Sequence, residues 1–87
     1  MDGPVMRLIT TEGVKAEPVA DEHERSLVGR HANAVGQFLA TGNVDPLSLF
    51  DGVAIAGHPL LTDPDELERW AAHGELEFED IYDATGR

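Results

Sequence analysis

A chain of 87 residues makes one small domain, and at this length only about 60–65% of the unfolded chain's surface can be buried. No cysteine occurs, which excludes disulfides, thiolate nucleophiles, and zinc–sulfur and iron–sulfur sites. The formal net charge of −11 is concentrated in residues 45–87, where eleven acids stand against two bases. This field disfavours direct binding to nucleic acid, and it suits either a basic protein partner or a role in solubility alone.

The first part of the chain predicts a β-hairpin. Two β-leaning runs in residues 5–18 flank Gly13, which can supply the positive φ of a tight turn, and Pro18 closes the second strand. We expect residues 1–4 to be disordered and residues 1–87 to form a single domain.

A long amphipathic helix is expected between Asp21 and Gly42. Asp21 is a typical N-cap residue, and Glu24 follows it at capping-box spacing. Apolar positions recur at three- and four-residue intervals, at Leu27, Val28, His31, Val35, Phe38 and Leu39. This stripe should face the core.

A short helix and a buried strand are expected next. Asp45, which is followed by Pro46, starts a short helix that runs through Phe50. Residues 53–56 are an apolar run typical of a buried strand, and residues 57–59 interrupt it. Residues 60–61 should continue as an edge strand or as a loop packed on the core.

The clearest local signal marks a second helix. Asp63 has the side chain of an N-cap and Pro64 suits the first helical position, so a helix should run to His73, with Gly74 just beyond it. Residues 75–82 fit either a short strand or a final helical turn. The predicted fold class is therefore α+β, consisting of an N-terminal hairpin, a long amphipathic helix, a short helix, a buried strand, a second capped helix and a short C-terminal segment.

No motif indicates a metal, a cofactor or a membrane. The four histidines never stand three or four residues apart, so they lack metal-ligand spacing. The glycines do not have the spacing of a phosphate-binding loop, and neither serine lies in the Gly-x-Ser-x-Gly motif of serine hydrolases. No apolar run approaches the roughly 18 residues of a membrane span, and no signal-peptide pattern is present. We expect a cytoplasmic protein without a cofactor.

Two histidines leave an enzymatic alternative open. His31 lies on the apolar stripe and is most simply a core-edge side chain bonded locally. His58 lies in a Gly-His-Pro turn, where a nearby acid would make it a proton-transfer group. The alternative is a small enzyme or ligand-binding domain that uses His31 or His58 with a carboxylate.

The C-terminal part carries the expected contact face. Aromatic and aliphatic anchors surrounded by charge are typical of a protein-binding element. The candidate contact residues are Trp70, Glu75, Glu77, Phe78, Glu79, Ile81 and Tyr82. The competing interpretation is that the apolar members of this set close the core.

Four segments carry a resemblance: RSLVGRH at 25–31, FLATG at 38–42, LTDPD at 61–65 and GELEFEDIY at 74–82. Together they resemble short proteins or segments encoded by actinobacteria and their phages, over roughly residues 24–82. That family has no assigned activity, so the resemblance implies an origin and no chemistry. Many members have an aromatic residue after the histidine, where this chain has Ala32.

The leading functional hypothesis is a non-catalytic, acidic protein-binding or regulatory module whose partner is another protein, with a homo-oligomer as an option. A further alternative is a nucleic-acid mimic or antitoxin-like inhibitor that presents its acidic half to a basic protein.

Overall fold

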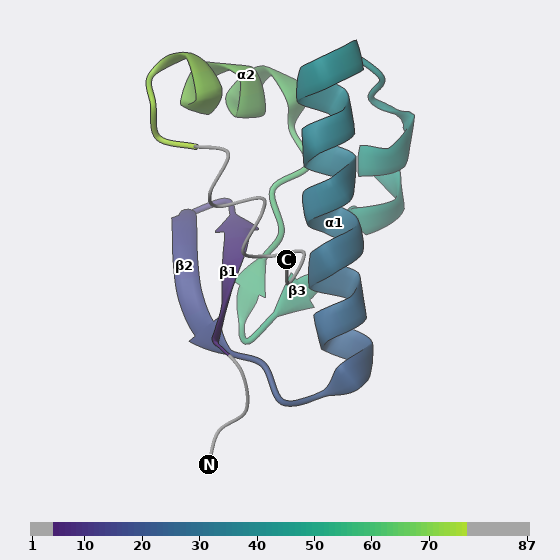
Figure 1. The fold of residues 1–87 in the computed structure, drawn as a ribbon, viewed down its shortest axis with the longest axis vertical. Helices are drawn as coiled ribbons and strands as arrows, with labels where there is room; N and C mark the ends of the chain where they lie inside the picture. Colours follow the sequence, from purple (N-terminus) through teal and green to yellow (C-terminus); the bar gives the residue numbers. More distant parts are fainter. Residues whose placement is uncertain (1–4, 77–87) are drawn as a thin grey trace.

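The computed structural model describes residues 5–76, and they form a small α+β domain. The elements in chain order are β1 (Val5–Thr10), β2 (Gly13–Pro18), α1 (Glu22–Thr41), the 3-10 helix η1 (Asp45–Phe50), β3 (Ala54–Ile55), β4 (His58–Pro59) and α2 (Pro64–Ala72). Figure 1 shows α1 running beside the β1–β2 hairpin, with α2 lying across the end of the domain where that hairpin turns.

The predicted N-terminal hairpin is confirmed. β1 and β2 are antiparallel, with Val5 opposite Pro18 and Thr10 opposite Gly13. Gly13 has a φ of 120°, which a residue with a side chain rarely adopts. The Thr10 hydroxyl donates to the Gly13 carbonyl at 2.6 Å and accepts from the Glu12 N–H at 3.1 Å. These local bonds fix the turn.

β1 lies in the middle of the sheet region, because a second segment pairs with its other edge. The Leu61 N–H donates to the Ile9 carbonyl at 2.9 Å, and the Thr11 N–H donates to the Pro59 carbonyl at 3.1 Å. An isolated bridge joins Thr10 to Leu60. This central position explains why the last three residues of β1 are all buried, although a strand with one wet face would alternate.

The buried strand expected over residues 53–56 is shorter than predicted. β3 contains only two residues, of which Ile55 is buried, and it pairs with β4. The turn between them has a φ of 52° at Ala56 and 81° at Gly57. Two-residue hairpin turns need positive φ, and an alanine there gives no sequence signal. Residues 58–59 therefore pair as β4 instead of simply interrupting a strand.

The capped long helix is confirmed at both ends. The Asp21 side chain accepts from the N–H groups of His23 and Glu24, and Gly42 adopts the left-handed conformation with its N–H bonded to Phe38. The helix buries Val28, His31, Ala32, Ala34, Val35 and Phe38. Two members of the predicted stripe differ, since Leu27 is only partly buried and Leu39 is exposed.

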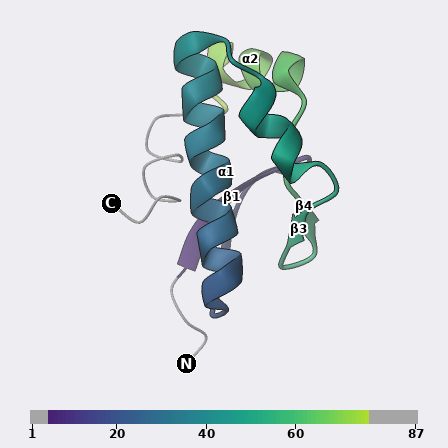
Figure 2. The ribbon, with the colours of Figure 1, turned by 90° about the vertical axis from the view of Figure 1, so that its right-hand side faces the viewer.

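The remaining helices complete the core around α1. Figure 2 shows η1 alongside the C-terminal half of α1, with β3 and β4 below it. η1 buries Leu47 and Phe50, and α2 buries Leu67 completely. The buried apolar residues, which also include Leu8, Ile9, Val19, Leu60, Leu61 and Leu76, form one continuous cluster. A domain this small depends on having one such core.

The cap of α2 gives a direct stability test. The Asp63 side chain accepts from the Asp65 N–H at 3.0 Å, so Asp63→Ala should lower the free energy of unfolding by about 1 kcal/mol. Urea denaturation measures it. Glu68→Ala, at an exposed position of the same helix, is the control and should change stability little. Equal midpoints for wild type and Asp63→Ala would contradict the cap.

Candidate functional site

Two of the seven predicted contact residues can be placed. Trp70 is partly buried near the end of α2, and Glu75 is exposed just after it. Glu77, Phe78, Glu79, Ile81 and Tyr82 lie outside the described residues.

The C-terminal end of α2 brings Trp70 and Glu75 together. Gly74 has a φ of 75°, which reverses the chain, and the Glu75 N–H then donates to the Trp70 carbonyl at 2.9 Å. The Leu76 N–H points to the same carbonyl at 3.3 Å, and the Leu76 side chain is buried in the core. Glu75 is therefore held next to the helix by its own backbone and by its neighbour.

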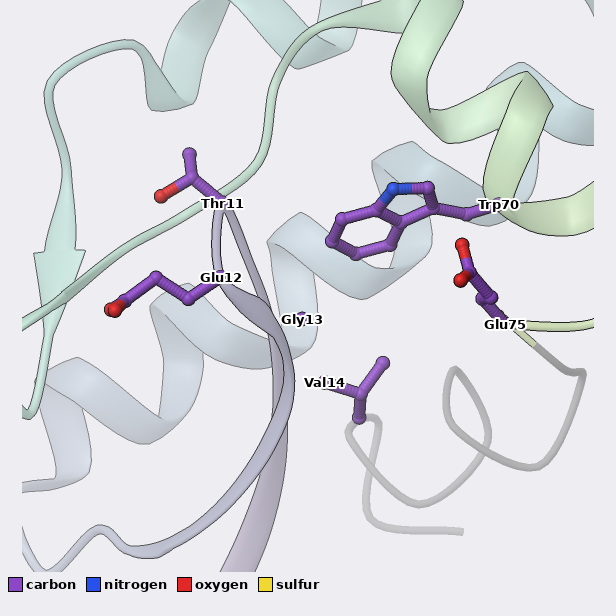
Figure 3. A pocket seen from close by; sticks show the side chains of 6 residues that line it. All are labelled: Thr11, Glu12, Gly13, Val14, Trp70 and Glu75. Carbon is purple, nitrogen blue, oxygen red and sulfur yellow. The ribbon is translucent and has the colours of Figure 1, made fainter.

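A surface hollow lies between this end of α2 and the turn of the first hairpin. It has a volume of about 280 Å³ and is lined by Thr11, Glu12, Gly13, Val14, Trp70 and Glu75. In Figure 3 the indole lies near Gly13, and Val14 and the Glu75 side chain bound the same space. The Glu12 carboxylate points away from the indole. The side chains that face into the hollow are thus the aromatic ring of Trp70, the aliphatic side chain of Val14 and the carboxylate of Glu75.

The hairpin side of this hollow was not part of the predicted site. The turn residues lie more than fifty positions from Trp70 in the sequence, and only the tertiary fold brings them together. The sequence pattern of these residues predicts a turn, but it does not show which other part of the chain packs against that turn.

His58 contacts two carboxylates from the first hairpin. Its Nδ1 lies 3.4 Å from Glu12 Oε1, and its Nε2 lies 3.2 Å from Glu17 Oε1. The structure therefore brings His58 beside two carboxylates, which is the pairing that the enzymatic alternative names. The contacts join β4 to the hairpin turn and to β2, and pairs this exposed contribute at most about 1 kcal/mol.

His31 is a core residue, as the apolar stripe indicates, but its partner is not local. The side chain is 1% exposed, and Nε2 lies 2.7 Å from the carbonyl oxygen of Leu61. The Phe50 ring meets it edge-on, with ring centroids 5.3 Å apart and an interplanar angle of 72°. No carboxylate in residues 5–76 bonds to the ring, so the alternative of a His31–carboxylate pair lacks support among these residues.

The environment of His31 selects its protonation state. Burial lowers the pKa of His31 from its ordinary value of 6.5, while the hydrogen bond to the Leu61 carbonyl acts in the opposite direction. Because a carbonyl can only accept, Nε2 carries the proton of the neutral ring. His31 is therefore a fixed hydrogen-bond donor in the core.

The described part of the chain contains neither a grouped set of metal ligands nor a membrane-spanning helix. Within residues 5–76, no three acidic or histidine side chains are grouped so as to hold a metal ion. In the same residues, no helix combines the length and the apolar character needed to cross a membrane.

Comparison with known proteins found no match to this chain among family models, curated proteins or solved structures. The resemblance to short proteins of actinobacteria and their phages therefore stays a prediction from the sequence.

The lowered pKa of His31 predicts a pH-dependent stability. Below pH 6.5 the unfolded chain takes up a proton that the folded chain binds less readily, so the free energy of unfolding falls as the pH falls. The slope from this group is at most about 1.4 kcal/mol per pH unit. It should appear in urea denaturation between about pH 7.5 and 5.

His31→Gln is the matched variant, because its amide can still donate to Leu61 but does not titrate. The other histidines and the carboxylates remain in both proteins. The difference between the two pH profiles therefore isolates His31. Parallel profiles across this range would show that the buried ring does not resist protonation.

Proposed function

We propose that this chain is a non-catalytic, cytoplasmic protein-binding module whose partner presents a basic surface. The observation that carries this proposal is the hollow between α2 and the first hairpin, where an indole ring and a carboxylate share one exposed depression. Tryptophan is one of the residue types enriched among energetically dominant interface contacts.

The charge of the chain supports a basic partner. The net charge is −11, and Glu75 is followed by four further acids in residues 77–83. A partner of opposite sign would be attracted over the whole surface and then held by specific contacts. A nucleic-acid mimic or antitoxin-like inhibitor would use the same acidic surface, so it is a special case of this module.

A small enzyme is the second candidate, and the contact of His58 with Glu12 and Glu17 is the observation that favours it. A histidine next to carboxylates is a common proton-transfer arrangement. Here, however, each ring nitrogen already faces a carboxylate from the same hairpin. This geometry suits a tether between β4 and the hairpin better than a group that must reach a substrate.

The acidic surface can be tested with a triple variant, Glu75→Gln, Glu77→Gln and Glu79→Gln. An arginine-rich peptide serves as the probe, in stopped-flow titrations at about 50 and 300 mM NaCl. If these acids form the contact, the association rate falls and its dependence on salt flattens.

A second triple variant provides the control for net charge alone. Glu22→Gln, Glu24→Gln and Asp45→Asn remove the same number of charges from the first turns of α1 and η1. Its salt dependence should stay close to that of the wild type. The same loss in both variants would mean that charge acts without a defined contact surface, and the module would lose its support.

A further inference from the structure

The hollow between α2 and the hairpin turn has the composition of a receptor for a cation. Trp70 is the only tryptophan of the chain and is partly buried, so it is fixed by packing while part of its surface remains open. The face of an indole attracts a cation placed within about 6 Å of its centre. Glu75 supplies a negative charge beside the ring.

The carboxylate of Glu75 has no basic partner among the described residues. The nearest arginine or lysine in sequence, Arg69, instead lies 4.0 Å from Glu66, one helical turn before it. Glu75 itself is exposed, and within residues 5–76 its one hydrogen bond is from its backbone N–H to the Trp70 carbonyl. Its charge is thus available to a partner.

The hairpin turn leaves room for a side chain to enter. Gly13 has no side chain, and a Cβ built there would meet nothing within 4 Å. Val14 adds an aliphatic wall to the same space. A long, flat side chain with a charged end can place its methylene groups against Val14 and its charge between the indole and the carboxylate.

We propose that the hollow of Trp70, Glu75 and Val14 receives an arginine side chain of the basic partner. This inference rests on the proposed function and adds the chemical group that is recognised. Arginine fits better than lysine, because its planar guanidinium can stack on the indole and bond a carboxylate at the same time.

The test uses the full-length chain and three short peptides. The peptides differ only in the residue that occupies the positions between the glycines. The first contains arginines separated by glycines, the second has citrulline in place of arginine, and the third has lysine. Citrulline keeps the shape of arginine and removes its charge. Since Trp70 is the only tryptophan, its fluorescence reports on the hollow itself.

The arginine peptide should give a saturable change in Trp70 emission, the lysine peptide a weaker one, and the citrulline peptide none. Calorimetric titration then compares Glu75→Gln with Glu68→Gln, an exposed glutamate of α2 that does not line the hollow. Glu75→Gln should weaken the arginine peptide about five- to tenfold and Glu68→Gln less than twofold. Trp70→Phe, which keeps an aromatic ring in the core, should weaken it several-fold.

Two results would overturn the arginine site while leaving the basic partner in place. One is arginine-peptide binding that Glu75→Gln and Trp70→Phe leave unchanged. The other is equal affinity for the arginine and lysine peptides, since a surface that senses charge alone would not distinguish them. Failure of every basic peptide to bind would remove the proposed function as well.

Other occupants of the hollow give their own signatures. If Arg87 of the same chain filled it, Arg87→Gln would shift Trp70 emission in the absence of any peptide. If a second copy filled it, emission would change with protein concentration, in step with the mass measured by sedimentation. Either result would overturn the assignment to a partner's arginine, and the proposal expects neither.

Discussion

The backbone of Leu61, which lies between β4 and α2, joins β1 to α1. Its N–H donates to Ile9 in β1, and its carbonyl accepts from the buried ring of His31 in α1. The side chain is itself in the core. Buried backbone groups must find partners, so a residue that has one on each side fixes the helix and the sheet relative to each other.

This connection also determines where α2 lies. The Asp63 cap follows Leu61 by two residues, and α2 starts immediately after it. The contacts of residues 59–61 with β1 end at the hairpin turn, because Thr11 bonds to Pro59 there. The helix is therefore directed across that turn (Figure 1), and the Trp70 indole lies beside Gly13 of the turn (Figure 3). The hollow is a consequence of core pairing, not of any local motif.

The sequence predicted the features that depend on short-range chemistry. Both helix caps, the hairpin at Gly13 and the glycine that ends α1 follow from side chains a few residues apart. It did not predict the partner of His31, the turn at Ala56, or the hairpin wall of the hollow. The first and last of these join residues far apart in the chain, and the second uses a residue type that rarely adopts positive φ.

We propose that Trp70 and Glu75 contact an arginine of a basic partner. The most direct measurement is the set of nuclear Overhauser effects between a bound arginine peptide and the protein. We expect effects from the arginine methylene protons to the Trp70 ring and the Val14 methyl groups. Effects confined to another surface, such as that around the exposed Leu49 of η1, would contradict it.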